Sequence, residues 1–385
     1  MASIRKRGET YTITAYLGYD ENYKQVKKTT TFRPPNGVTA NKAEKLAKEY
    51  AIIWEQKIRG YTSLDENRTF RELITWFLET IAPTTWREST FVSRNTDLNA
   101  YVLPKLGHVK LKDITPQMLD NFFSEMQKNG RVNGEKPLSA ATVGRTRQII
   151  CTIFSAACRK EIMTRNPCKL TTPLTMQTYY KAQGYLNDEQ AVMLLEALET
   201  VDTQFRLAIT LLLFTGCRGG EICALRWACV DFENNYIYIE KTLTYIPRKG
   251  YSLEPPKTRQ SERYIAIPQF VMDLLKEHKN TQIVTDSAMQ GMCFIGANGG
   301  FYGEAGLNKR FKKLAKQLGF PENVHLHSLR HTAASIMINS DIPTRVISEQ
   351  LGHATTVITE NVYGHVFAQS KIKAMQAIEM KLKKQ

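Results

Sequence analysis

The stretch that most constrains this chain runs from residue 325 to residue 365. It holds five of the seven histidines, two arginines and one tyrosine. Ser328 can cap a helix that continues to Ile338. A second helix is predicted between Pro343 and Gly352, because proline suits a first turn and glycine suits a helix end. Backbone N–H groups at helix starts attract anions, so the stretch favours a phosphate-binding site.

Three side-chain types in this stretch suit attack on a phosphate. His327 and Arg330 lie in the first turns of the first predicted helix, and a third helical stretch carries Val357, Ile358 and Tyr363. A guanidinium is planar and permanently charged, an imidazole can move a proton near neutral pH, and a phenol can act as a nucleophile. Together these groups indicate phosphate chemistry.

Three motifs follow one another across the second half of the chain. They are TGCRGGEICALRW at 215–227, PPKTRQSERYIAIP at 255–268, and H-x-L-R-H at 327–331 with L-G-H at 351–353 and Y-G-H at 363–365. The series resembles the first arginine box, the lysine-bearing hairpin and the C-terminal signature of the tyrosine recombinases, the phage integrase family. With its small basic head, the chain most resembles the integrases of conjugative transposons and temperate phages of Gram-positive bacteria.

This resemblance implies a catalytic set. Its members are Arg218, Lys257, His327, Arg330, His353 and the nucleophile Tyr363, with Glu221 in support. The arginines would stabilise a pentavalent phosphate, the lysine would protonate the 5′ oxygen, and the histidines would orient the phosphate or move a proton. The implied activity is site-specific DNA recombination through a 3′-phosphotyrosine intermediate, which integrates and excises a mobile element without ATP, metal or another cofactor.

Composition agrees with a polyanionic partner. The net charge is +15 and the isoelectric point is near 9.4, a surplus that favours nucleic acid. No run of eighteen apolar residues is present, so no membrane partner is expected. The seven cysteines form no CxxC pair, which indicates a reducing, cytoplasmic location in a bacterium rather than a disulfide framework.

The first sixty residues are predicted to form a separate basic module. Alternation around 11–17 and a threonine-rich run at 26–32 indicate strands, with a turn at 20–22, and helical spacing from Ala40 to Ile58 indicates a helix. The segment has twelve Lys and Arg against six Asp and Glu. It resembles an arm-binding domain, and its candidate DNA-binding residues are Arg5, Lys6, Lys27 and Lys28; a small sheet with solvated charges is the alternative.

The next hundred residues are predicted to be helical. Predicted helices include 91–103, ending before Pro104, one starting at Thr115, and a long one opening at Ser139. The segment resembles a core-binding domain. Its candidate DNA-binding residues are Arg145, Arg147, Arg159 and Lys160, for which a solvated basic face is the alternative reading.

We therefore expect a multidomain fold, mainly α with small β-sheets (α+β). The expected parts are an arm-type module (1–62) with a three-stranded sheet and a helix, a helical core-binding domain (63–168), a linker (169–184) and a mixed α/β catalytic domain (185–385). In the last part, short strands are predicted at 230–232, 236–240 and 263–267. A terminal helix carries an apolar stripe at Ile372, Met375, Ile378 and Leu382, which could fold back or dock on a neighbouring protomer.

Three alternatives remain open from the residues. His325, His327 and His331 have an H-x-H-x3-H spacing that a zinc ion could use, although no metal is expected. Residues 346–363 imitate a helix-turn-helix, which would suit a DNA-binding regulator without catalysis. A type IB topoisomerase would use the same chemistry.

The resemblance also implies partners. These are double-stranded DNA of element ends and target, a tetramer of this chain in the synapse, and an excisionase and a host DNA-bending protein as accessory factors.

Overall fold

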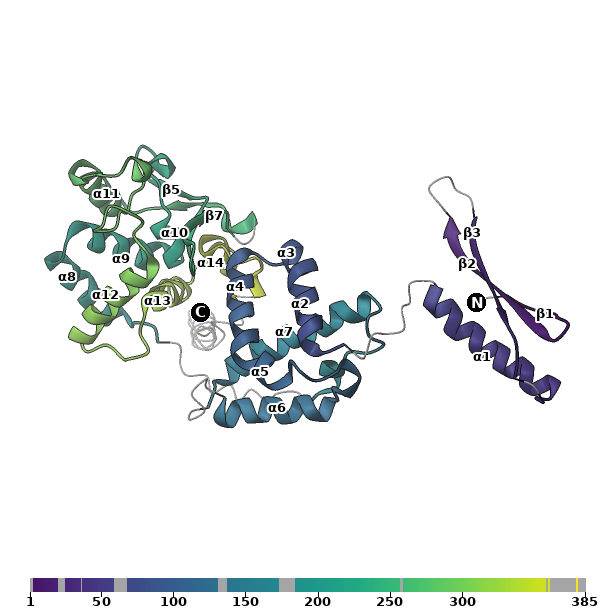
Figure 1. Cartoon of the computed structure of the whole chain (residues 1–385). Coiled ribbons are helices and arrows are strands. Elements are labelled where there is room, and N and C mark those ends of the chain that lie inside the picture. The colour runs from purple at the N-terminus through teal and green to yellow at the C-terminus, as the bar shows by residue number, and fades with distance from the viewer. Residues whose placement is uncertain are drawn as a thin grey trace. The chain divides into compact units, whose positions relative to one another are not determined.

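The computed structural model describes residues 3–19, 25–35, 37–58, 68–130, 137–172, 184–256, 259–357, 359, 360 and 379. The chain divides into two compact units, Met1–Gln177 and Thr178–Gln385. Figure 1 follows the helices and strands of each unit in chain order. The predicted fold class is confirmed: helices dominate, and every sheet among the described residues is small and antiparallel. No described helix combines the length and the apolar content needed to cross a membrane.

The N-terminal part of the first unit is a sheet with one helix beside it (Figure 1). Its elements are β1 (Ser3–Arg7), β2 (Thr10–Tyr19), β3 (Gln25–Phe32) and α1 (Ala40–Ile58), and the strand order is β1-β2-β3. The predicted strands and helix are confirmed. Tyr11, Ala43 and Ala47 form its small core, because the side chains of β2 alternate and one face meets α1. The predicted turn at 20–22 lies outside the described residues.

The rest of the first unit is helical. Its elements are α2 (Phe70–Thr80), α3 (Ala82–Thr85), α4 (Glu88–Asp97), η1 (Leu98–Val102), α5 (Leu103–Leu106), η2 (Leu111–Asp113), α6 (Pro116–Asn129), α7 (Ala140–Arg159) and η3 (Pro167–Leu170). Thr115 and Ser139 cap α6 and α7 as predicted. Fully buried Phe70, Phe77 and Phe154 belong to its core.

The prediction that a helix stops before Pro104 is wrong. Pro104 lies inside α5, and the helical path from α4 reaches it through η1, a turn of π-helix. A proline cannot donate to the carbonyl four residues earlier, and its ring crowds that carbonyl. A π turn widens the helix locally, with Leu103 donating to Leu98 five residues back. The chain therefore continues past the proline instead of ending there.

The second unit carries the three motifs. Its helices are α8 (Asp188–Ala197), η4 (Leu198–Thr200), α9 (Thr203–Thr215), α10 (Gly219–Cys223), η5 (Trp227–Cys229), η6 (Arg259–Ser261), α11 (Gln269–Thr281), η7 (Ser287–Met289), α12 (Glu304–Gln317), α13 (Leu326–Asn339) and α14 (Thr344–Leu351). Helix α9 is almost wholly buried in the core of this unit. That burial fixes the position of the first arginine motif, which follows α9 directly.

In the sequence, the strands of two small sheets lie between α10 and α11. One contains β4 (Val230–Asp231), β5 (Tyr236–Ile239) and β8 (Arg263–Ala266), at the three predicted places; the other pairs β6 (Thr242–Ile246) with β7 (Gly250–Glu254), which the sequence prediction missed. The segment expected as a lysine-bearing hairpin joins β7 to β8. These two strands pair with different partners, so they are not the two arms of one hairpin.

The predicted start of the helix at Ser328 is also wrong. Helix α13 begins at Leu326, one turn of chain earlier than the Ser328 cap requires, and its cap residue is His325. Ser328 lies inside the first turn, where its Oγ accepts from the backbone N–H of His325. Ser328 is therefore the reciprocal partner of the cap residue in a capping box, not the cap itself.

Replacing Asn166 tests the hydrogen bonds that hold the end of the helical domain against α7. Asn166 is buried; its Nδ2 donates to Cys151 O (3.0 Å) and Ser155 Oγ (2.8 Å), and its Oδ1 accepts from Cys168 N (2.9 Å). We predict that Asn166→Ala lowers the free energy of unfolding by about 2 kcal/mol, since buried partners lose their bonds. Urea unfolding measures this. Asn99→Ala, at an exposed helix position, is the control and should change it by less than about 0.5 kcal/mol. Equal effects of the two changes would contradict this account.

Candidate active site

The first arginine motif begins where α9 ends. Gly216 ends the helix in the left-handed conformation, with φ of 64°, and the chain then turns into α10, whose cap residue is Arg218. Glycine is required at position 216 for two reasons. Left-handed backbone strains other residues, and a Cβ on Gly216 would meet Leu351 Cδ2 at 2.5 Å. The turn that leads to Arg218 therefore lies directly against Leu351 of α14.

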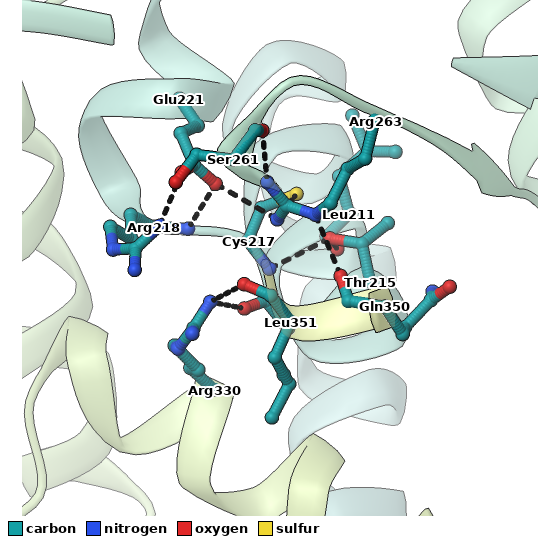
Figure 2. A network of polar contacts seen from close by, with 11 residues as sticks. Leu211, Thr215, Cys217, Arg218, Glu221, Ser261, Arg263, Arg330, Gln350 and Leu351 are labelled. Carbon is teal, nitrogen blue, oxygen red and sulfur yellow. Dashed lines mark hydrogen bonds and ion pairs between the residues drawn. The ribbon is translucent and has the colours of Figure 1, made fainter. Parts of the chain in front are cut away.

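Glu221 holds Arg218 in a fixed orientation. The carboxylate accepts the backbone N–H of Arg218 at 3.0 Å and its Nη1 at 2.7 Å, and Figure 2 shows Glu221 between Arg218 and Arg263. Glu221 is 3% exposed. Burial by itself would raise the pKa of this carboxyl, but the charges of Arg263 and Arg218 hold the pKa below its ordinary value of 4.5. Glu221 is therefore an anion that pairs with both arginines.

Arg330 joins two helix ends. It is 3% exposed, and its Nη1 donates to Gly216 O at 2.7 Å and to Leu351 O at 2.8 Å (Figure 2). Each carbonyl belongs to the last turn or cap of a helix, where the helix dipole places partial negative charge. Gly352 ends α14 in the left-handed conformation, with φ of 69°, as Gly216 ends α9. The buried guanidinium of Arg330 is thus held by one carbonyl from the first arginine motif and one from the L-G-H motif.

Two histidines of the predicted set lie in the field of these arginines. Burial, and then the charges of Arg330, His325 and Arg218, lower the pKa of His327 to about 4, although the residue as a whole is exposed. Burial, and then Arg330 and Arg218, also lower the pKa of His353 to about 4. His353 is half-buried, and its Nδ1 lies 2.8 Å from Thr359 Oγ1. At neutral pH both imidazoles are uncharged in the free protein.

The structure therefore brings together Arg218, Glu221, His327, Arg330 and His353. The pKa values of both histidines respond to both arginines, which places all four within electrostatic reach of one another. Two guanidinium groups and two neutral imidazoles beside a single carboxylate form an electropositive site that suits a phosphodiester. Lys257 and Tyr363, the other two residues of the predicted set, lie outside the described residues.

The remaining histidines of the stretch have other surroundings. The Nδ1 of His325 lies 2.9 Å from Asn323 O and 3.0 Å from Ser328 Oγ, and the ring of His331 stacks edge-on against His327 at 4.9 Å. Within the described part of the chain, no three His, Cys, Asp or Glu side chains are grouped so as to hold a metal ion. The zinc reading of this spacing thus gains no support.

The four DNA-binding candidates of the N-terminal module divide between the faces of its sheet. All four are exposed. Arg5 pairs with Thr12 and Lys27 pairs with Tyr16, whereas Lys6 pairs with Tyr11 and Lys28 pairs with Ala15, whose side chains are buried. Because paired residues share a face, Arg5 and Lys27 lie opposite α1, and Lys6 and Lys28 lie on the side of α1. Arg5 and Lys27 are therefore the better candidates for DNA contact, because they lie on the open face of the sheet, the face opposite α1.

The four candidates on α7 also differ from one another. Arg159 and Lys160 are exposed at its end. Arg145 pairs with the buried Asp97 at 3.0 Å, and Arg147 donates to Thr171 Oγ1 at 3.1 Å. The last two side chains therefore have partners within the fold, and DNA contact by any of the four stays a prediction.

Arg263 is the residue of this site that sequence reasoning missed. It is 8% exposed, and its guanidinium reaches Glu221, Ser261 O and Gln350 O. The sequence signal for Arg263 was the alternation of inward and outward residues along β8. Arg263 shares the inward face with the buried Ile265 and Ile267, whereas Tyr264 points outward. A charged residue on the core face of a strand requires a buried partner.

Replacing Gly216 tests the close approach of the two motifs. We predict that Gly216→Ala lowers the free energy of unfolding by about 1–3 kcal/mol more than Gly319→Ala does, because both add left-handed strain but only the first adds a clash with Leu351. Gly319 is the matched control, with φ of 71° and open space around its Cβ position. Urea unfolding measures both variants. Equal losses would show that the contact does not matter.

The lowered histidine pKa values predict a loss of stability in acid. Well above pH 6.5 His327 and His353 are neutral whether the chain is folded or unfolded, so their protonation does not change stability. As the pH falls from about 6.5 toward 4, the unfolded chain takes up protons that the folded site refuses, and stability falls. The midpoint of thermal unfolding measured against pH should show this fall. A variant with both His327→Gln and His353→Gln should show less of it; an unchanged dependence would be the contrary result.

Two family models match the chain. The model of the phage integrase family matches residues 184–370, which include every described residue of the predicted catalytic set, and the model of a phage integrase N-terminal SAM-like domain matches residues 69–127. A "tyrosine recombinase XerC-like" protein of Caldanaerobacter subterraneus subsp. tengcongensis is 27% identical over 400 aligned positions, which cover 97% of each chain.

Two more comparisons point the same way. The transposase from transposon Tn916 of Enterococcus faecalis is 23% identical and aligns over 76% of this chain and 73% of its own length. Among solved structures, a Tn1549 transposon integrase in complex with circular intermediate DNA has a TM-score of 0.70 at 18% identity and covers 80% of this chain and 99% of its own, a likeness of fold. The chain belongs to the phage integrase family of tyrosine recombinases.

Proposed function

We propose that this recombinase is the integrase of a mobile element, and that it opens one DNA strand by attack of Tyr363 on a phosphodiester. The observation that carries the proposal is the joint placement of Arg218 and Arg330, both fixed by protein partners, beside His327 and His353. The products of cleavage are a 3′-phosphotyrosine link and a free 5′ hydroxyl.

The arginines supply positive charge that stabilises the transition state. A phosphate under attack carries extra negative charge on its non-bridging oxygens, and guanidinium forks match those oxygens. Arg218 and Arg330 are held by Glu221 and by two main-chain carbonyls before any substrate arrives. Because this orientation is already fixed, little reorganisation is needed during the reaction.

The remaining groups handle protons. A phenol has an unperturbed pKa of about 10, so Tyr363 needs a base or nearby positive charge to attack at neutral pH. The neutral imidazoles of His327 and His353 can accept a proton or donate a hydrogen bond to phosphate. Lys257 follows from the motif alone, as the donor of a proton to the leaving 5′ oxygen.

The reaction conserves bond energy. The phosphotyrosine link replaces one phosphodiester with another, so a 5′ hydroxyl from a second duplex can attack it and rejoin the strand without ATP. Repeating the exchange on the other strand recombines two duplexes through a Holliday junction and thereby integrates or excises the element. Four copies of the chain acting in pairs would complete one recombination event.

The other parts of the chain would position the DNA. The N-terminal module offers Arg5 and Lys27 on the open face of its sheet, which suits a DNA groove. The helical part offers Arg159 and Lys160. An excisionase and a host DNA-bending protein would set the direction of the reaction, as the family resemblance implies, inside a bacterial cytoplasm.

Replacing Tyr363 tests the nucleophile. We predict that Tyr363→Phe forms no SDS-resistant adduct with a nicked duplex of the element end, on which cleavage is irreversible, but binds that duplex as the wild type does, since only one hydroxyl is lost. Gel electrophoresis and a binding titration measure the two properties. Tyr264→Phe, at an exposed position of β8, is the control and should cleave normally. Normal cleavage by Tyr363→Phe would remove this tyrosine from the site.

Replacing Arg218 tests the phosphate contact. Arg218→Lys keeps a charge but loses the planar fork, so we predict that the cleavage rate falls by roughly a hundredfold or more. Single-turnover cleavage of the same duplex measures the rate. Arg206→Lys, which alters an arginine of α9 paired with Glu199, is the matched control. An unchanged rate for Arg218→Lys would exclude Arg218 from phosphate binding.

The same substrates separate the alternatives. A regulator would bind the duplex without forming any adduct. A type IB topoisomerase would relax a supercoiled plasmid that lacks a recombination site, which an integrase should leave supercoiled.

A further inference from the structure

We propose that Arg263 is a positioning residue for strand cleavage: it orients Glu221, and through it Arg218, and it holds the turn that leads to His353. The inference rests on the proposed function, because it explains how groups assigned there are held. Arg263 itself is not assigned to the phosphate, because Nε, Nη1 and Nη2 of its guanidinium each donate to a protein partner.

Every nitrogen of the Arg263 guanidinium has a partner. Nε donates to Gln350 O at 2.8 Å, Nη1 donates to Ser261 O at 2.8 Å, and Nη2 donates to Glu221 Oε2 at 3.1 Å and lies 3.5 Å from Cys217 Sγ (Figure 2). These four partners come from three segments of the sequence: the first arginine motif, the segment before β8, and α14. A planar fork with fixed directions can join them in one geometry, which a flexible ammonium cannot reproduce.

The contact with Glu221 decides how Arg218 is held. Glu221 Oε1 accepts from Arg218 Nη1, and Oε2 accepts from both Arg263 Nη2 and the backbone N–H of Arg218. The two arginines therefore divide one carboxylate between them. Without Arg263, Oε2 would lose its charged partner, and the carboxylate could turn toward Arg218. The charge of Arg218 would then be neutralised more fully, and its guanidinium would lose its present orientation.

The contact with Gln350 decides how the L-G-H turn is held. Gln350 immediately precedes Leu351, whose carbonyl binds Arg330, and Gly352, which leads to His353. A Cβ on Gly352 would meet Arg263 Nη1 at 2.8 Å, so the guanidinium packs directly against this turn. Arg263 is thus placed to hold the backbone on which both Arg330 and His353 depend.

A positioning role also explains why a charge is buried here. Burying an arginine and a glutamate costs desolvation free energy that their attraction only partly offsets, and apolar replacements of such pairs are often as stable. Stability alone therefore gives weak reason for Arg263. Orientation of a second arginine, which an apolar residue cannot supply, gives a stronger one.

The test compares Arg263→Met, of similar length, with Arg263→Lys, which keeps the charge. Arg226→Met is the matched control, because Arg226 also pairs with a glutamate, Glu240, in the same unit but outside this network. Single-turnover cleavage of the nicked duplex, its binding affinity and the thermal unfolding midpoint are measured for each. We expect Arg263→Met to cleave about 10- to 100-fold more slowly with affinity within about twofold of wild type, Arg263→Lys to fall between, and the control to cleave normally.

A substrate with a neutral methylphosphonate at the scissile position separates positioning from general damage. Such a phosphorus centre carries one negative charge less, so it depends less on Arg218. We expect the deficits of Arg263→Met and of Arg218→Lys, each relative to wild type, both to shrink on this substrate. A deficit of the same size on both substrates would overturn the proposal, because it would reflect loss of structure alone.

The remaining outcomes are decisive too. Wild-type cleavage by Arg263→Met, or an equal loss of binding and cleavage, overturns the inference while leaving the proposed function intact. If Arg263→Met does not fold, Arg263→Lys decides: slower cleavage at unchanged affinity supports the role, and wild-type cleavage overturns it. Failure of the wild-type protein to form any adduct overturns the proposed function and the inference together.

Discussion

The structure of the site depends on one buried guanidinium that joins two helix ends. Arg330 binds Gly216 O at the end of α9 and Leu351 O at the end of α14. Both helices end at left-handed glycines, and a side chain on Gly216 would strike Leu351. The cation therefore requires the two turns to approach each other, and the glycines permit it. The same two turns carry Arg218 and His353, so the interaction that places Arg330 also gathers its neighbours.

Charge balance within the network explains its chemistry. Arg218 and Arg263 share a single carboxylate, Glu221, and Arg330 adds a third positive charge to the network. The excess of positive charge attracts phosphate, and it contributes to keeping the nearby imidazoles neutral in the free protein. When a phosphodiester enters, its negative charge opposes the arginine field, so the histidines become easier to protonate.

Much of this fold followed from local signals. Alternation and helical spacing placed β2, β3 and α1, and caps at Thr115 and Ser139 placed α6 and α7. Pro104 misled the prediction, because a π turn let the helix pass it. The motifs named Arg218, His327, Arg330 and His353, but spacing cannot show which backbone carbonyls hold a buried arginine. Arg263 and its partners lie far apart in sequence, and only packing brings them together.

The central claim is that this network serves attack by one tyrosine on one phosphate. Isolation of the covalent protein–DNA complex, digestion of both components and mass spectrometry of the modified peptide test it most directly. The account predicts a nucleotide joined through a 3′ phosphate to the peptide that contains Tyr363, with a free 5′ hydroxyl on the other fragment. A link to another residue, or to a 5′ phosphate, would contradict it.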